Sequence, residues 1–497
     1  MTTQNGLAPR QVLLVELNEI TWRLLQPLLD QQALPALADL LRRGVRATAI
    51  APEVSPDLDP WISWTTLYTG RPSAEHGVKF LEQPPETVQG PRIWDIAADA
   101  GKSLGLFGSI MSWPPRQDFR GFWVPGTFSP DEATYPASLQ PIQELNLTYT
   151  RAHSPLAAGQ RRSSKLSLLW KLRRLGLKLS TLGEIASFFA RRAAGRAHEW
   201  EKVSLQPLLN LDFFEALWTE HRPDFATFHT NHVAHYQHRY WRSTDPTPFL
   251  EQPSADESRK YGGAIRFGYK SADRLVRRLQ RLVGPETVLV VASGLGQQPY
   301  VSKEFREGRT VVRLQEIEQL LDLLGVRGQC EPYSVMAPQW NVRFRTAEAR
   351  ERAARGLAAA YYGAADQPLL SHLVAGDTIC LNVCQKLPRP IDWDTPCVFP
   401  ETGQTISMRQ LCAEKDPTPK QGYHEAAGVF MMAGPGIRAG VDLHECSTLD
   451  LAPTMLHLMG LPIPDHMPGR VLEEALETPP ARHRKESVLE PAGVQHS

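Results

Sequence analysis

Residues 12–19 read Val-Leu-Leu-Val-Glu-Leu-Asn-Glu, and this stretch decides the fold. Residues 12–17 form an apolar run that polar residues bound on both sides. Such a run is typical of a parallel strand that is buried on both of its faces. A strand is therefore predicted at residues 12–17, and the polar pair Asn18-Glu19 ends it.

Helical and strand patterns alternate along much of the remaining chain. Leucines recur at helical spacing over residues 24–41, and residues 93–101 favour a helix that leads into a strand at residues 104–107. Further strands are predicted at residues 225–229 and 287–292 and at the start of the stretch 428–436, with a helix at residues 264–282. This alternation predicts an α/β fold with a doubly wound, mainly parallel sheet.

The composition is that of a large globular α/β protein. The chain has 497 residues, of which 42% are hydrophobic and 22% charged, and its formal net charge is zero. A neutral chain has no overall field that would steer it to nucleic acid, so no specific nucleic-acid partner is expected. The N-terminus lacks the pattern of a signal peptide and no apolar run is long enough to span a bilayer, so a cytoplasmic location is expected.

Two segments depart from the core pattern. We expect one large α/β domain over residues 11–477, interrupted by a basic helical insertion at 150–204 and a second insertion or cap at 340–420. A charged, proline-rich and disordered tail is expected at residues 478–497. The basic insertion fits either a solvated helix pair or, through residues 161–196, a contact with an anionic surface.

Several motifs together carry a resemblance to a known family. They are Thr69-Gly70-Arg71-Pro72 with His76-Gly77, Trp94-Asp95 before Gly101, and Gly434-Pro435-Gly436 followed by Asp450-Leu-Ala-Pro-Thr. With the first strand, they resemble the alkaline phosphatase superfamily, in its type I phosphodiesterase/nucleotide pyrophosphatase-like branch. The resemblance implies a three-layer α/β/α sandwich with helical insertions, which sulfatases share, and a hydrolase of phosphate esters.

The resemblance also locates a two-metal site in which most ligands are replaced. In the family the first strand ends in a metal-binding aspartate and a threonine is the nucleophile, whereas this chain has Asn18 and Pro60 at those positions. The family's Asp-x-x-x-His pair matches Asn231 and His235. Its Asp-His pair matches Ser293 and Gly294, and its late histidine matches His424.

These replacements lower the expected metal content. Zinc prefers imidazole, thiolate and carboxylate ligands, and Asn18, Ser293 and Gly294 supply none of them. No metal ligand is assigned, and at most one weakly bound zinc is expected, held at the His235–His424 side if Glu425, His232 or His238 moves in. Cys380, Cys384 and Cys397 could also hold zinc in principle, but buried free thiols are the better interpretation.

The remaining polar residues give the candidate site. Asp59 and Pro60 are expected to be the N-cap and N1 residues of the helix beginning at Trp61, and a carboxylate there could also act as a base. His229, His232, His235 and His238 follow a spacing of three, which on one helix gives a polar stripe. We therefore predict catalytic roles for Asp59, His235 and His424. Ligand-binding roles are predicted for Asn18, Glu19, Asn231, His232, His238 and Ser293. Trp61, Trp64, Trp241 and Tyr236 offer stacking faces for a sugar or base, or pack in the core.

Three functions remain open at this stage. The first is a divergent phosphate-ester hydrolase or group transferase, linked by the resemblance to polysaccharide or nucleotide-sugar metabolism, with a saccharide- or phosphate-containing small molecule as ligand. The second is a catalytically silent ligand-binding or scaffold protein, and the third a zinc phosphodiesterase with substitute ligands. Fold alone does not choose among them, so whether the chain is an enzyme stays open.

Overall fold

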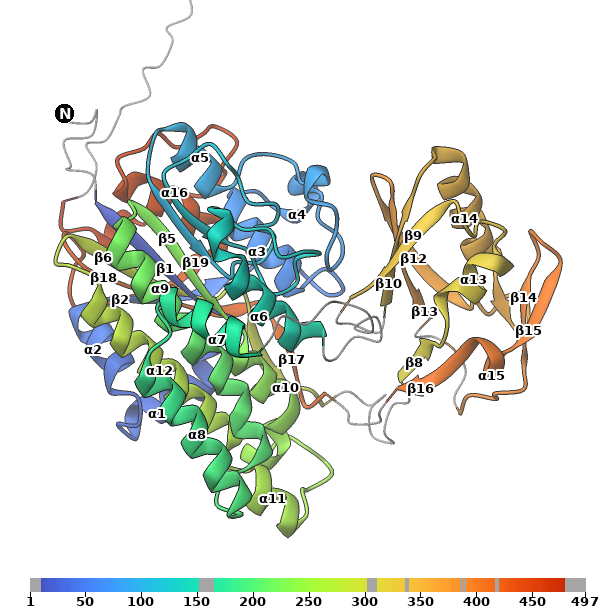
Figure 1. Cartoon of the computed structure of the whole chain (residues 1–497), viewed down its shortest axis with the longest axis horizontal. Helices are drawn as coiled ribbons and strands as arrows, with labels where there is room; N and C mark the ends of the chain where they lie inside the picture. Colours follow the sequence, from blue (N-terminus) through green and yellow to red (C-terminus); the bar gives the residue numbers. More distant parts are fainter. Residues whose placement is uncertain are drawn as a thin grey trace, which may run out of the picture.

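A computed structural model of the chain describes residues 10–151, 165–301, 311–335, 339–384, 387, 390–415 and 420–478. Within them a main domain is built on an eight-stranded sheet, and a smaller lobe lies beside it (Figure 1). The predicted tail from residue 479 onward lies outside the described residues, as do Arg161 and Arg162 of the basic insertion.

The sheet is mixed and mostly parallel. In spatial order its strands are β19 (Val441–Ser447), β2 (Gly44–Ile50), β18 (Ala427–Ala433), β6 (Thr287–Ala292), β1 (Gln11–Leu17), β5 (Phe225–Thr230), β3 (Leu104–Phe107) and β4 (Gly121–Val124). Only β18 runs antiparallel to both of its neighbours within this described sheet. The strands predicted at 12–17, 104–107, 225–229 and 287–292, and the one at the start of 428–436, are confirmed.

Alternation along β1 builds two cores, one on each face of the sheet. Leu13, Val15 and Leu17 belong to one buried cluster, while Val12 and Leu14 belong to the other. Successive side chains of a strand point to opposite faces, so this central apolar strand must be covered by helices on both sides. The α/β class with an alkaline-phosphatase-like layering, as predicted, follows from this arrangement.

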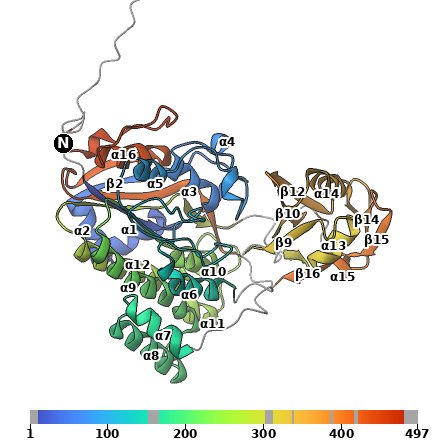
Figure 2. The ribbon, with the colours of Figure 1, turned by 45° about the horizontal axis from the view of Figure 1, so that its top comes forward.

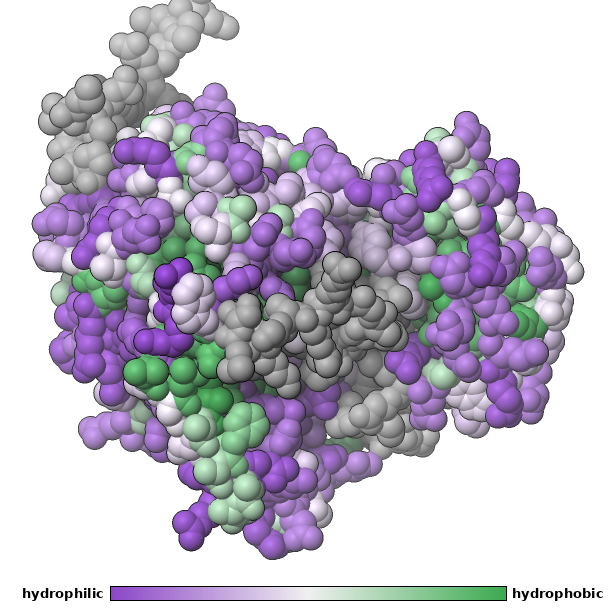
Figure 3. Space-filling model, viewed as in Figure 1, coloured by the Kyte–Doolittle hydropathy of each residue, from purple (hydrophilic) through white to green (hydrophobic). Residues whose placement is uncertain are grey.

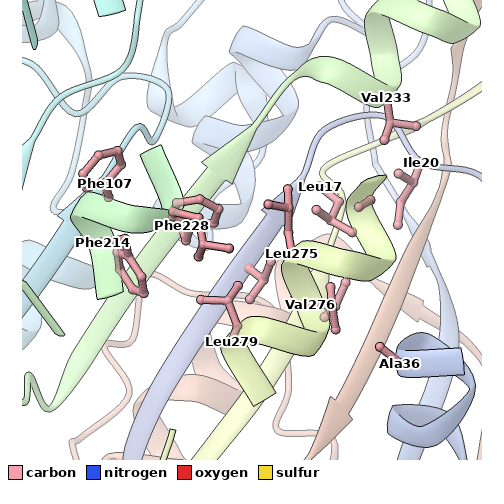
Figure 4. Close-up of a cluster of buried hydrophobic side chains, with 14 of the residues drawn as sticks. Leu17, Ile20, Ala36, Phe107, Phe214, Phe228, Val233, Leu275, Val276 and Leu279 are labelled. Atoms are coloured by element: carbon pink, nitrogen blue, oxygen red, sulfur yellow. The ribbon is translucent and has the colours of Figure 1, made fainter. Parts of the chain in front are cut away.

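The first face carries the larger helical layer. It consists of α1 (Trp22–Asp30), α2 (Pro35–Arg43), α9 (Leu205–His221), α10 (His232–Thr244) and α12 (Ala264–Leu282), with α6 (Gln140–Arg151) and α11 (Ala255–Tyr261) at its border. Figure 4 shows Leu275, Val276 and Leu279 of α12 close to Leu17 and Phe228 of the sheet. The helix predicted at 264–282 is therefore confirmed, and its apolar stripe faces the core.

The second face is covered by α3 (Pro60–Thr69), α5 (Ile93–Asp99) and α16 (Leu451–Leu458), with the short α4 (Ser73–His76) next to α3. Helix α3 begins as predicted, because the Asp59 side chain accepts a hydrogen bond from the Trp61 N–H at 2.9 Å and Pro60 is the first helical residue. It ends at Gly70, whose φ of 60° is left-handed.

The smaller lobe has a hydrophobic core of its own. Its strands are β8 (Val311–Leu314), β9 (Cys330–Ser334), β10 (Gln339–Phe344), β11 (Tyr361–Tyr362), β12 (Leu370–Ala375), β13 (Thr378–Val383), β14 (Pro396–Phe399), β15 (Gln404–Ser407) and β16 (Cys412–Lys415). Its helices are α13 (Ile317–Leu323), α14 (Ala347–Ala359) and α15 (Met408–Leu411). The boundary predicted at residue 340 falls inside β10. Figure 2 shows the lobe set to one side of the main domain.

The chain enters and leaves this lobe through one hairpin-like pair of strands. β7 (Gly296–Pro299) pairs antiparallel with β17 (Gly422–Glu425), and Pro299 lies opposite Gly422. The basic insertion forms α7 (Lys165–Arg174), α8 (Leu179–Ala193) and the short helix η3 (Glu199–Ser204) next to α9. None of the described helices is both long and apolar enough to cross a membrane.

Candidate functional site

Glu19 lies at the centre of the candidate site, in the turn that follows β1. Its side chain is buried, and its φ of 60° is left-handed, a conformation that costs free energy for a residue other than glycine. The Gln237 side chain holds this turn by donating to the Glu19 carbonyl at 2.8 Å. The fold thus keeps a strained backbone here and aims the carboxylate at the carboxyl edge of the sheet.

Two histidines from distant parts of the chain point at the same oxygen of Glu19. The Oε2 atom lies 3.1 Å from Nε2 of His238 on α10 and 3.5 Å from Nε2 of His424 on β17. One ligand atom from each of these three residues lies within 4.8 Å of the others, which makes a group that can hold a metal ion.

Backbone carbonyls set the tautomer of both histidines. Nδ1 of His238 lies 2.8 Å from the Gly422 carbonyl, and Nδ1 of His424 lies 2.9 Å from the Leu58 carbonyl. A carbonyl oxygen only accepts hydrogen bonds, so each Nδ1 must carry the proton. The Nε2 atoms therefore face Glu19: a protonated Nε2 donates to the carboxylate, and a deprotonated Nε2 offers its lone pair to a metal ion, which is the usual arrangement of metal-binding histidines.

The charges of this group are strongly coupled. Burial disfavours ionised Glu19, but the charges of His238 and His424 and hydrogen bonds from His238 and Gln297 outweigh it and lower the pKa of Glu19 to about 2. Burial also lowers the pKa of His424, although the negative charges of Glu19 and Asp59 oppose that effect. At neutral pH the site therefore offers a carboxylate and a neutral His424 imidazole.

Hydrogen bonds from neighbouring amides orient Glu19. The Asn18 Nδ2 atom donates to Glu19 Oε1 at 3.0 Å, and the Gln297 amide donates to Glu19 Oε2. Gln297 lies on β7, which pairs with the β17 strand that carries His424. The sequence pattern did not lead to Gln297. The signal that could have found it is its position three residues after Gly294, the end of the Ser293-Gly294 match.

The other half of the site expected from the resemblance is filled by protein. Asn18 Nδ2 donates to Asn231 Oδ1 at 2.7 Å, while Asn18 Oδ1 accepts from the Trp64 indole N–H at 2.7 Å. The Trp64 ring also lies so close to Gly294 that a Cβ there would be 3.2 Å from it. Ser293 Oγ donates to the Ile20 carbonyl and accepts from the Val429 N–H.

Asp59 lies at the edge of the Glu19 group. Its side chain caps α3, and its charge is near enough to His424 to raise the pKa of that imidazole. The Leu58 carbonyl that binds His424 belongs to the same loop. Asp59 is thus placed beside the three-residue group, and its predicted catalytic role stays a prediction.

The histidine stripe is only partly as predicted. His229 belongs to β5 and contacts Glu16 at 3.0 Å, because the strand continues to Thr230 and α10 begins only at His232. His232 is buried next to Thr230, and burial lowers its pKa to about 4. His235 packs edge-on against Tyr236 and is not a member of the Glu19 group.

The aromatic residues considered as stacking faces are all buried: Trp61, Trp64, Trp241 and Tyr236. That interpretation is wrong, because these rings form part of the two cores. Instead, Tyr300 and Tyr423 stack at 4.9 Å between ring centroids, and Tyr423 stacks on His424 at 4.8 Å. Tyr423 is 38% exposed, so an aromatic face reaches solvent beside the site.

The alternative cysteine site gains no support from the geometry. Cys380 and Cys397 are buried, and burial raises the pKa of each thiol to about 12. A thiol that ionises so reluctantly is a poor metal ligand. Among the described residues, the group that can hold a metal is the one at Glu19.

The layered fold and the polar edge after β1 define an alkaline-phosphatase-like α/β protein. Residues 12–362 match the model of the family described as type I phosphodiesterase / nucleotide pyrophosphatase, and the chain belongs to that family. Enzymes of this family use zinc.

Individual relatives are distant. Over 63 residues the chain is 41% identical to a Caenorhabditis elegans protein named "Putative extracellular sulfatase Sulf-1 homolog", a stretch that is 12% of this chain and spans 9% of that protein's length. Murine ectonucleotide pyrophosphatase / phosphodiesterase 5 is 12% identical, with a TM-score of 0.41 over 94% of this chain and 100% of that one. A mutant of alkaline phosphatase PafA is 14% identical, with a TM-score of 0.48 over 95% and 99%.

Proposed function

We propose that this protein is a phosphate-ester hydrolase or group transferase that uses one zinc ion, held by Glu19, His238 and His424, in place of the family's two. The observation that carries the proposal is the convergence of two Nε2 atoms on one carboxylate oxygen. Ligand atoms bound to one tetrahedral zinc ion are about 3.3 Å apart. The separations of 3.1 and 3.5 Å lie on either side of that value.

The donor set also fits zinc chemically. Two histidines and one glutamate are the protein ligands of several catalytic zinc sites, which keep a further position for water or substrate. When bound, zinc would supply a Lewis acid and lower the pKa of a water molecule. The amides of Asn18 and Gln297 fix the carboxylate, and two carbonyls fix the imidazoles, as outer-shell partners of metal sites do.

Other residues of the chain take the remaining roles in the proposed reaction. In this proposal Asp59, whose charge acts on His424, accepts a proton, and Pro60 excludes the family's threonine nucleophile, so water or an acceptor substrate attacks. Lys420 lies near enough to His424 to lower its pKa, so it offers a positive charge to a phosphate group. Tyr423, stacked on His424, offers a face to a sugar or base. These features support a sugar- or nucleotide-linked phosphate as the substrate class.

The test measures metal and turnover together. Protein purified without chelator should bind about one zinc per chain, removable by chelation, and should act on nucleotide sugars or sugar phosphates better than on aryl phosphate esters. Asn18→Asp/Asn231→Asp protein should not gain a second ion, because Trp64 fills that space. Two tightly held ions in the unmodified protein would contradict the proposal and favour ordinary two-metal phosphodiesterase chemistry.

A second candidate function is a catalytically silent ligand-binding protein. The closed network of Asn18, Asn231 and Trp64 favours it, since these groups satisfy one another where the family places reactive ones. The two candidate functions predict different experimental results. A silent protein would bind a nucleotide sugar, with a rise in melting temperature, yet release no product with or without zinc.

A further inference from the structure

The basic insertion exposes large hydrophobic side chains. On α7 and the start and middle of α8, Trp170 is 58% exposed, Leu179 69% and Phe189 60%. Figure 3 shows hydrophobic residues gathered over these two helices, with strongly hydrophilic residues beside them. Single exposed apolar residues are ordinary, but a band of them on one face marks an interaction surface.

Helix α8 is apolar on its outer face as well as its inner one. Thr181 and Phe188 are buried against the domain. The outer side carries exposed residues at helical spacing, which are Leu179, Gly183, Ala186, Phe189, Ala190 and Ala193. Exposed polar residues of α8, which are Ser180, Glu184, Ser187, Arg191 and Arg192, lie beside this apolar stripe. A surface helix normally turns one apolar stripe to the core and polar residues to water, so a second apolar stripe is unusual. The outer face of α8 therefore lacks a partner among the described residues.

Positive charge surrounds this apolar band. Residues 165–196 contain eight lysines and arginines and one acidic residue, Glu184. Lys178, Arg191 and Arg192 form ion pairs with glutamates of the main domain or of η3. Lys171 makes no ion pair with a described residue, and the Arg174 guanidinium lies 3.9 Å above the Trp170 ring. Charge and exposed aromatic surface thus coincide at α7.

We propose that α7 and α8 together form a docking surface for an anionic lipid bilayer. Apolar side chains can enter the boundary between headgroups and acyl chains, while neighbouring lysines and arginines contact acidic headgroups. Tryptophan favours that boundary, and long basic side chains extend from it to water. This surface is separate from the Glu19 site, and the inference does not depend on the proposed function.

Other occupants fit less well. A second copy of the chain would bring two surfaces of the same strong positive charge together, which opposes association. Nucleic acid would be attracted by the charge and could stack on Trp170 or Phe189, but it offers nothing to the aliphatic Leu169 and Leu179. Lipid is the partner that uses both the aliphatic and the basic residues.

The test is sedimentation of the full chain with vesicles of phosphatidylcholine, with and without phosphatidylglycerol. Binding should require the anionic lipid and weaken as salt is raised. Trp170→Ser/Phe189→Ser and Lys171→Glu/Arg174→Glu proteins should each lose binding at least about tenfold, because each change removes one of the two contributions. All four side chains are exposed, so melting temperatures should stay near that of the wild type.

Matched controls come from the smaller lobe. Leu373→Ser on β12 and Arg352→Glu on α14 change similarly exposed residues and should leave vesicle binding unaltered. The proposal is overturned if the wild type does not sediment with anionic vesicles or if the control variants lose binding equally. It is also overturned if sedimentation velocity shows a dimer that Phe189→Ser separates, or if single-stranded RNA competes fully with the vesicles.

Discussion

At the scale of single residues, the central question is which histidines serve the site. The sequence pattern pairs His235 with His424, whereas the structure aims His238 and His424 at Glu19. His235 lies one turn earlier on α10 and contacts Tyr236 instead. His235 and His238 lie on the same helix but contact different groups, so substituting each of them separately distinguishes their roles.

We expect His238→Ala and His424→Ala proteins to lose bound zinc and at least about a hundredfold in activity, since each removes one of three ligands. His235→Ala should keep the metal. His444, whose side chain is 89% exposed, provides a neutral control. Elemental analysis and calorimetric melting of the four variants check this. Loss of zinc from His235→Ala but not from His238→Ala would restore the pairing predicted from the sequence.

A second residue-scale prediction concerns acid stability. His76 is fully buried, and burial lowers its pKa to about 4 from an ordinary value of 6.5. Its Nδ1 accepts from the Val78 N–H at 3.1 Å, so protonation breaks that bond. Between pH 6.5 and 4, His76 therefore stays mostly neutral in the folded state but becomes protonated in the unfolded chain. The associated stability is full above pH 6.5 and falls as the pH drops towards 4, by up to about 3 kcal/mol.

His76→Asn protein keeps an oxygen acceptor for the Val78 N–H but has no proton to gain. Its free energy of unfolding at pH 7.5 should be about 1–3 kcal/mol lower than that of the wild type, and the difference should shrink towards pH 4. Urea titrations at several pH values measure both quantities. Parallel curves for the two proteins across this range would show that His76 does not cause the acid sensitivity.

At the scale of elements, α3 combines two roles at one N-terminus. Asp59 caps the helix and also places a negative charge beside His424, while Trp64, one turn further on, fills the space next to Gly294. The same helix therefore supports the Glu19 group and closes the other half of the site expected from the resemblance.

The two roles of Asp59 can be separated by substitution. Asparagine caps helices about as well as aspartate, so Asp59→Asn should leave the melting temperature nearly unchanged but lower activity about 10²-fold or more by removing the base. Asp59→Ala should in addition destabilise the protein by about 1 kcal/mol. Steady-state kinetics and thermal melts of both variants provide the check, and full activity in Asp59→Asn would leave the residue a cap alone.

At the scale of the whole molecule, the smaller lobe is a separate unit with its own core. Described contacts bridge it to residues 81–86: Tyr333 to Glu82, Asn341 to Leu81 and Glu82, and Arg343 to Glu86. The chain leaves the main domain at Tyr300 and returns at Gln421, and these two residues are hydrogen-bonded to each other. The smaller lobe is therefore an insertion between two residues that lie next to each other at the end of the β7–β17 strand pair.

Replacing residues 301–419 by a short Asn-Gly loop should accordingly leave a main domain that folds and keeps its zinc, because β7 and β17 are already placed for a tight turn. Cooperative thermal unfolding and zinc content test this. Arg343→Ala in the full chain, which removes the exposed ion pairs of Arg343 with Glu86 and Asp377, should change stability by less than about 1 kcal/mol. An insoluble or metal-free main domain would mean that the lobe helps to form the site.

The sequence by itself determined the features that depend on near neighbours. The apolar run at residues 12–17 set the buried strand, Asp59-Pro60 set the start of α3, and residues 264–282 were predicted as the helix that α12 forms. Hydrophobic periodicity and capping act over a few residues, so the fold class and most strands could be read directly. The family motifs also led to His424 and to the neutral Asn18 and Asn231.

Only the tertiary structure decided how the site is assembled. Glu19, His238 and His424 come from three elements that are far apart in the sequence, and spacing cannot show that two imidazoles share one oxygen. The carbonyls of Leu58 and Gly422 set the histidine tautomers, and main-chain acceptors leave no signature in residue type. The burial of Trp64 against Gly294 likewise depends on how α3 packs on the sheet. Long-range packing, rather than local pattern, brings together the one group within the described residues that could hold a metal ion.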